Sequence, residues 1–161
     1  PFIFKNIDKV RGFKISMAIE AALLIGMYFV PAGNVAAIFA LVIIINIIQL
    51  AATPLQWSML SDIIDAEEKR SGKKLSGIVF STNLFAIKLG IAIGGALVGY
   101  MLAWGDYVGG AAQQTDSALQ MIKLLFTVFP GVLVALLVVI MSKYSLDDKR
   151  LSRLAQDDLP A

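Results

Sequence analysis

The chain has 161 residues, of which 58% are hydrophobic and only 16% charged, and its formal net charge is +2 at pH 7. The mean hydropathy of +0.77 excludes an ordinary water-soluble domain and predicts an all-α integral membrane protein. Cysteine and histidine are absent, so disulfide frameworks, thiolate or imidazole metal sites and histidine-based triads are excluded. We therefore expect no cofactor, no metal site and no nucleic-acid partner for this chain.

The chain begins at Pro1, without an initiator methionine, in a mixed polar and apolar segment. We interpret it as the C-terminal piece of a longer protein. Residues 1–14 are predicted to form a cytoplasmic loop, and four transmembrane helices follow, because about 20 residues cross a hydrocarbon core of about 30 Å. The expected spans are residues 15–30, 35–65, 77–104 and 118–142, and residues 143–161 form a tail.

The second apolar run is longer than a membrane requires. If it continues to Arg70, it is about 54 Å long at about 1.5 Å per residue. Such a helix either projects into water or bends. Pro54 marks the expected bend, because proline removes an i to i−4 hydrogen bond.

The basic residues predict the orientation of the spans, because cytoplasmic segments carry an excess of lysine and arginine. They gather in three segments that should share one side of the membrane: Lys5, Lys9, Arg11 and Lys14; Lys69, Arg70, Lys73 and Lys74; and Lys149, Arg150 and Arg153. The loop 105–117 on the other side has no basic residue. We expect a multi-pass protein of the plasma or inner membrane with both ends of this chain cytoplasmic.

A polar stripe runs along the second span. Its residues recur at intervals of three, four and three, which places them on one helical face: Asn46, Gln49, Thr53 and Gln56. The stripe either hydrogen-bonds neighbouring helices or lines a water-filled cavity, where amides offer donors and acceptors to substrate hydroxyls. Trp57, at its edge, either stacks on a sugar ring or fills a helix interface.

Three acids lie near the C-terminal end of the same helix, where the helix dipole disfavours carboxylates: Asp62, Asp65 and Glu68. One interpretation is local pairing, since Asp65 and Lys69 are four residues apart. The other is a cytoplasmic gate, in which the acids tie this helix to its neighbours through salt bridges that break when the protein opens inward.

The third span combines a lone cation with small residues. Two GxxxG pairs predict close helix packing: Gly90 with Gly94, and Gly95 with Gly99. Lys88 lies near the midplane and shares a face with Ser81, so it is a candidate for a binding site with a carboxylate partner. Glu20 is the best acid in this chain, but it lies too near the cytoplasmic side, so we expect the partner in the rest of the longer chain.

The segment from Pro54 to Tyr100, PLQWSMLSDIIDAEEKRSGKKLSGIVFSTNLFAIKLGIAIGGALVGY, resembles helices ten and eleven of the glycoside-pentoside-hexuronide:cation symporters. These belong to the melibiose and xyloside permease group of the major facilitator superfamily. The pattern consists of Gln56, the three acids, Gly72, Gly77, Ser81, Lys88 and the following glycines. Ala66 and the pair Asn83-Leu84 depart from melibiose-type members, which leaves the cation preference and sugar contacts open.

The resemblance implies a twelve-helix symporter of which this chain supplies helices nine to twelve. A sugar at the midplane would move with a proton or sodium ion by alternating access. By the same resemblance, Lys88 faces that site, and Asp62 and Asp65 act at the gate. Together with the polar stripe, Ser81 and Trp57, Asn83 is a candidate site-lining residue. The cation-binding acids would belong to the N-terminal helices.

Two other classes of protein remain. Paired carboxylates at Asp62 and Asp65 suit a divalent metal, as in an intramembrane transferase, but spans three and four offer no further acids. The chain could also be a complete small four-helix assembly protein. We expect a transporter and not an enzyme.

Overall fold

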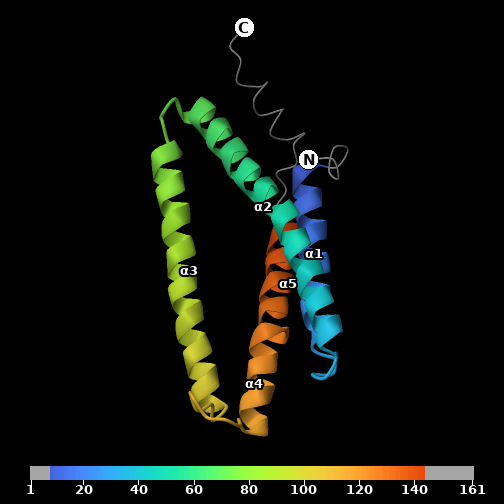
Figure 1. Ribbon diagram of the computed structural model, residues 1–161. Helices are drawn as coiled ribbons and strands as arrows, with labels where there is room; N and C mark the ends of the chain where they lie inside the picture. The colour runs from blue at the N-terminus through green and yellow to red at the C-terminus, as the bar shows by residue number, and fades with distance from the viewer. Residues whose placement is uncertain (1–7, 144–161) are drawn as a thin grey trace.

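The computed structural model of the protein describes residues 8–143. Within that range five helices are joined by turns and loops, and no strand occurs, which confirms the all-α class (Figure 1). Three of its helical segments are long and apolar enough to cross a membrane: Val35–Ser71, Ser76–Trp104 and Asp116–Ser142. Two of the three predicted basic segments lie partly or wholly outside the described range, since it excludes Lys5, Lys149, Arg150 and Arg153.

Helix α1 covers Lys9–Met27 and begins before the boundary expected at residue 15. The side chain of Asp8 accepts a hydrogen bond from the backbone N–H of Val10 at 2.8 Å, so the helix is capped at this point. Residues expected in a cytoplasmic loop therefore form the first turns of the helix. Three cations and Glu20 fall within α1, which explains why it is absent from the three most apolar segments.

Helix α2 covers Val35–Ser71, so the long run continues past residue 65 as one helix. Asn34 caps its start, and Gly72 ends it with a positive φ of 66°. Pro54 lies inside the helix. Figure 1 shows that the half of α2 after the proline leans away from α5 toward the start of α3, as expected for a proline-induced bend.

Helix α3 covers Ser76–Trp104 and runs back toward the opposite end of the molecule (Figure 1). The last apolar segment is divided into α4, Asp116–Phe126, and α5, Val128–Ser142. The break at Thr127 was not predicted. Pro130 explains it, because a proline cannot donate to the carbonyl four residues earlier, which here belongs to Phe126. At the break itself, the Thr127 hydroxyl donates a hydrogen bond to the Lys123 carbonyl, with the two oxygens 2.6 Å apart.

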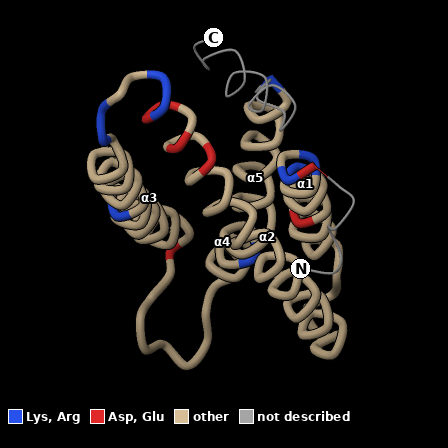
Figure 2. The backbone as a smooth tube through the Cα atoms, turned by 90° about the horizontal axis from the view of Figure 1, so that it is seen from above, with Lys and Arg blue, Asp and Glu red and all other residues tan. Residues whose placement is uncertain are grey.

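The core lies where α1, α2 and α5 pack together. Phe13, Met17 and Ala52 are buried there, and partly buried side chains of α2 and α5 surround them: Leu55, Met59, Val134, Val138 and Met141. Helix α3 has no buried residue and stands apart from α1 in both Figures 1 and 2. The large exposed apolar surface of α2, α3 and α5 suits contact with lipid or with further helices.

Candidate functional site

The acids at the end of α2 have three different environments. The Asp62 carboxylate accepts a hydrogen bond from the Lys9 ammonium, with Nζ and Oδ2 2.7 Å apart. This ion pair joins α2 to α1 across 53 positions of sequence. The gate interpretation requires a link of this kind between helices. Both partners of the pair belong to this chain. That the pair breaks during transport stays a prediction.

Glu68 caps the next helix. Its Oε1 accepts from the backbone N–H groups of Leu75 and Ser76 at 2.7 and 2.8 Å. The N-cap residue of α3, Leu75, makes no side-chain capping bond of its own. The acid therefore faces the positive end of the α3 dipole, which offsets its unfavourable place near the end of α2. Glu68 lies beyond the apolar part of α2. The hydrogen bond from the N–H of Ser76, followed by the one from Leu75, holds the pKa of Glu68 below its usual range.

Asp65 is exposed, and within residues 8–143 no ion pair to it is formed, so the expected pair with Lys69 is absent. The local pair joins Glu67 and Arg70 instead, with two hydrogen bonds of 2.8 and 3.0 Å. The bonded guanidinium lowers the pKa of Glu67. The sequence reasoning missed Glu67, although its i, i+3 spacing to an arginine was a usable signal.

A cavity of about 300 Å³ opens between the helices, next to the buried core. It brings together three predicted site residues from two helices, namely Gln56 and Trp57 of α2 and Asn83 of α3. Apolar side chains complete its lining: Phe13, Met59, Leu60, Ile63, Leu137 and Met141. The cavity thus offers two amides and an indole face in a mainly apolar setting, which is the composition of a small-molecule site.

Trp57 makes a defined aromatic contact at this cavity. Its ring stacks on Phe80 of α3, with centroids 6.4 Å apart and planes inclined by 20°. The tryptophan residue remains 39% exposed. Both interpretations of this tryptophan thus keep some support, because one face contacts a helix neighbour while the residue still borders the cavity.

The rest of the polar stripe lies outside that cavity and is exposed. The Asn46 amide donates to the Val42 carbonyl, and the Thr53 hydroxyl donates to the Gln49 carbonyl, each at 2.8 Å. Two of the four side chains thus bond to their own helix. Within the described residues, none of the four hydrogen-bonds a neighbouring helix, so whether the stripe lines water stays a prediction.

Lys88 and Ser81 are exposed on α3 and do not line the cavity. In the part of the chain that the structure describes, Lys88 has no ion-pair or hydrogen-bond partner. Glu20 cannot serve, because α1 and α3 lie on different sides of the structure (Figures 1 and 2). The prediction that a residue of another segment pairs with Lys88 stays open.

The glycines of α3 have open space around them. A Cβ atom placed on Gly90, Gly94, Gly95 or Gly99 would meet no atom within 4 Å, so their predicted close contact is not made within residues 8–143. One tight contact is at Gly105, where a Cβ would lie 2.8 Å from Cβ of Met121. Another is at Gly131 of α5, where a Cβ would lie 2.7 Å from Cγ1 of Ile25. Sequence reasoning missed this glycine because it lacks a GxxxG partner.

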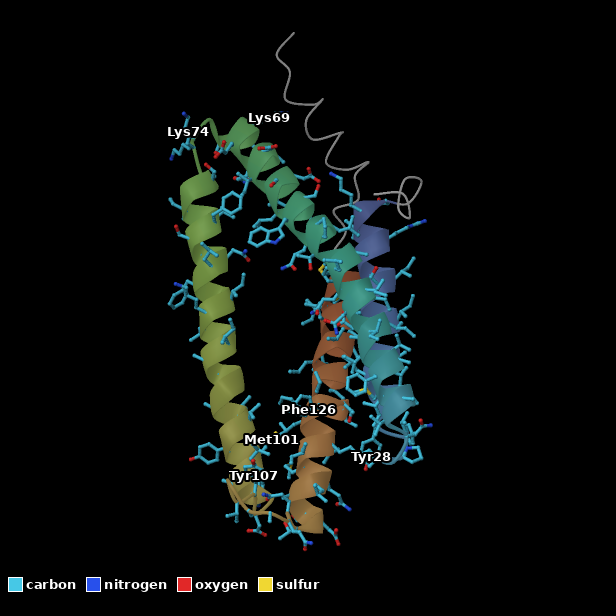
Figure 3. The ribbon with its side chains drawn as sticks, in the orientation of Figure 1. Tyr28, Lys69, Lys74, Met101, Tyr107 and Phe126 are labelled. Carbon is cyan, nitrogen blue, oxygen red and sulfur yellow. The ribbon has the colours of Figure 1, made fainter. Side chains whose placement is uncertain are left out.

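The two ends of the bundle differ chemically. Figure 3 shows Lys69 and Lys74 at one end, and Tyr28 and Tyr107 at the other. Figure 2 shows, from the first of these ends, the lysines and arginines around the helix termini. At the second end, the Lys123 ammonium lies 4.8 Å from the centre of the Tyr28 ring, a cation–π contact that lets this lysine remain among apolar helices.

Among residues 8–143, no group of three or more carboxylates could hold an ion, and Asp62 is already paired with Lys9. Within that range, Asp62 and Asp65 thus have no third acid beside them of the kind that binds a divalent metal.

The helices are long and apolar, and much of their apolar surface is exposed. A cavity lined by both polar and apolar side chains lies between them. These features define a multi-pass helical membrane protein. Comparison with known proteins gives its family. A family model described as "MFS/sugar transport protein" matches residues 1–148. The chain belongs to this family of the major facilitator superfamily, and the resemblance to the glycoside-pentoside-hexuronide:cation symporters is confirmed. The family description is one of transport and not of catalysis.

Individual relatives agree with this placement. YagG of Escherichia coli, by its name a candidate glycoside/cation symporter, is 42% identical over 149 residues, which are 92% of this chain and 32% of YagG. The inner membrane symporter YicJ of the same organism is 38% identical over 84% of this chain and 30% of its own length. The isoprimeverose transporter of Lactiplantibacillus pentosus is 41% identical over 37% of this chain and 12% of its own. No solved structure gave a significant match.

The chain thus spans about a third of the length of the first two relatives.

Proposed function

We propose that the protein to which this chain belongs carries a sugar or glycoside across the membrane together with a proton or sodium ion, by alternating access. The family match supports transport, and the names of two relatives point to glycosides and isoprimeverose as the class of cargo. The observation that carries the proposal for this chain is the cavity, where Gln56, Trp57 and Asn83 meet. Amide groups and an aromatic face are the side chains that bind sugar hydroxyls and sugar rings.

Within that function, Gln56 and Asn83 contribute hydrogen bonds to the cargo, and Lys88 pairs with an acid of the N-terminal helices. The lysine is exposed and lacks a partner among residues 8–143, which supports a partner elsewhere in the full-length protein. An unpaired cation at that depth of a membrane is costly, so a counter-charge is expected.

We also propose that the basic end of the bundle is cytoplasmic. This follows the positive-inside rule, and it places the Lys9–Asp62 pair on the cytoplasmic side. Cysteines introduced as Gly33→Cys and Lys73→Cys report on opposite ends of α2. An impermeant thiol reagent added outside intact cells should label only the first, and labelling of only the second would reverse the orientation.

The transport proposal is tested with the full-length protein in membrane vesicles. Uptake of glycosides, pentosides and hexuronides is measured under separate proton and sodium gradients. We expect accumulation of at least one sugar class, with Gln56→Ala and Asn83→Ala weakening its apparent affinity. Gln120→Ala is the matched control, because this amide is exposed on α4 away from the cavity.

Absence of any gradient-driven uptake by the wild type would refute the function. Unchanged affinity in both cavity variants, with uptake intact, would refute the assignment of the cavity alone.

A further inference from the structure

Two parts of the structure are joined by connections that both contain a proline break. One part, here called the base, consists of α1, residues 35–53 of α2, and α5. The other, here called the arm, consists of residues 55–71 of α2, together with α3 and α4 (Figure 1). Pro54 interrupts the first connection inside α2. At the second, Pro130 follows Thr127, whose φ of −125° and ψ of −77° depart from the helical values of about −63° and −42°.

The base is held together by close packing. Phe13, Met17 and Ala52 are buried where its three helices meet. Directly after the second break, α5 lies so close to α1 that a Cβ on Gly131 would be 2.7 Å from Cγ1 of Ile25. Helix α5 is therefore fixed to α1 from its first turn.

The arm has its own internal contacts. The Trp57 ring stacks on Phe80, and Glu68 caps α3, so the second half of α2 is joined to α3 at two places. At the other end of α3, a Cβ on Gly105 would lie 2.8 Å from Cβ of Met121, so α3 and α4 also meet closely. These contacts oppose separate movement of the three helical segments of the arm.

Arm and base touch close to both breaks. Leu55 packs on the base directly after Pro54. Lys123, which lies over the Tyr28 ring at the end of α1, comes one turn before Thr127. Contacts so near a pivot change little when the arm turns about it.

The ion pair between Lys9 and Asp62 joins the arm to the base farther from the breaks. Asp62 follows Pro54 by eight residues, which is about 12 Å along α2 at about 1.5 Å per residue. Both side chains are partly exposed, so solvent screens the pair and the pair can open at small cost. It therefore has the position and the strength of a latch.

The cavity lies between the two parts. The arm supplies its two amides, Gln56 and Asn83, and the base supplies Phe13 and Leu137. A rotation of about 10° at Pro54 moves the far end of α2, about 26 Å away along the helix, by about 4–5 Å. Such a rotation changes the width of the cavity toward the basic end of the bundle.

We propose that the arm pivots on the base about Pro54 and the break at Thr127 and Pro130, and that this movement opens and closes the cavity, with the Lys9–Asp62 pair as its latch. The inference rests on the proposed transport function, for which it supplies a gate inside this chain. Helix ends and breaks of this kind commonly absorb the backbone rotation in hinge movements.

The test measures distances between spin labels on paired cysteines, in a cysteine-free background of the full-length protein in nanodiscs. Ile78→Cys with Ile140→Cys spans the arm and the base. Two control pairs lie within one part each: Ile15→Cys with Ile140→Cys in the base, and Tyr100→Cys with Leu119→Cys in the arm. All five side chains are exposed.

Asp62→Asn removes the charge of the latch. We expect it to shift the arm–base distance by about 3–5 Å and to leave both control distances unchanged. High salt, which screens the pair without any substitution in it, should give a shift in the same direction. Added to Asp62→Asn, Pro130→Ala restores a backbone donor at the break and should reduce the shift by a factor of about two or more. Gly94→Ala, which has open space around it, should leave the shift intact.

An arm–base distance that is unchanged both in Asp62→Asn and at high salt would overturn the inference, because this part of the protein would then be one rigid body. Equal changes in all three pairs, or a shift that Pro130→Ala does not reduce, would also overturn it. None of these distances depends on a sugar. A wild type that moves no sugar under either gradient would therefore refute the proposed function, while the pivot is decided by the distances alone.

Discussion

The ion pair between Lys9 and Asp62 allows the most direct test of how α2 is held to α1. The side chains are 40% and 33% exposed, so the pair is partly screened by solvent. Pairs of this kind contribute about 0.2–1 kcal/mol, which is a factor of about 1.4 to 5 in an equilibrium constant. We expect removal of the pair to shift the balance between attached and detached α2 by a factor in that range.

Single variants would not isolate this energy, because Lys9 makes a further interaction besides the one with Asp62. A double-mutant cycle does so, with Lys9→Ala, Asp62→Ala and the two combined, measured as thermal stability of the detergent-solubilised full-length protein. The same variants are then tested for thiol labelling of an engineered cysteine at the basic end. We expect a positive coupling energy that falls with added salt, and partial rescue by the exchanged pair Lys9→Asp with Asp62→Lys.

The reasoning would be refuted by strictly additive effects, with no coupling between the two positions and no rescue by the exchanged pair. A coupling energy without any change in labelling would keep the ion pair as a structural link and remove its role in a gate.

Three further predictions concern other elements. Gly131→Ala should destabilise the α1–α5 contact by about 1–3 kcal/mol, because its Cβ would lie 2.7 Å from Ile25; Gly94→Ala, with open space around it, is the control in a thermal-unfolding comparison. Glu68→Gln should reduce the loss of unfolding free energy that accompanies a fall in pH below about 4.3. The pKa of Glu68 is lowered by folding, so its contribution is present above the unfolded-state pKa and is lost as pH falls through the folded-state pKa; an unchanged profile would contradict the capping role. Lys88→Ala should abolish cation-driven sugar uptake in vesicles while leaving the amount of folded protein unchanged, and full uptake would exclude the lysine from the binding site.

Much of the fold could be predicted from the sequence, because membrane helices are encoded by length and apolarity. The bounds of α3 differ by one residue from the expected span, and Pro54 correctly marked a change of direction in α2. The helix ends were harder to predict. A capping bond from Asp8 extends α1 into the basic segment, and Pro130 divides the last span, so local hydrogen bonding and not hydropathy set these limits.

The candidate site was predictable in part. Residue type and helical periodicity selected Gln56 and Trp57, and the family resemblance added Asn83. Only the tertiary structure places these three at one cavity, because its walls come from four helices that are distant in sequence. The same periodicity selected Asn46 and Thr53, which bond to their own backbone outside the cavity.

The sequence alone determined that this protein lies in a membrane and the family to which it belongs, since these depend on composition and on local pattern. The tertiary structure decided the partners. It paired Asp62 with Lys9, made Glu68 the cap of α3, placed a tight glycine contact at Gly131 and left Glu20 buried without a hydrogen bond to Oε2. These contacts depend on which helix faces pack together, and such pairings between distant segments cannot be derived from the pattern along a single helix.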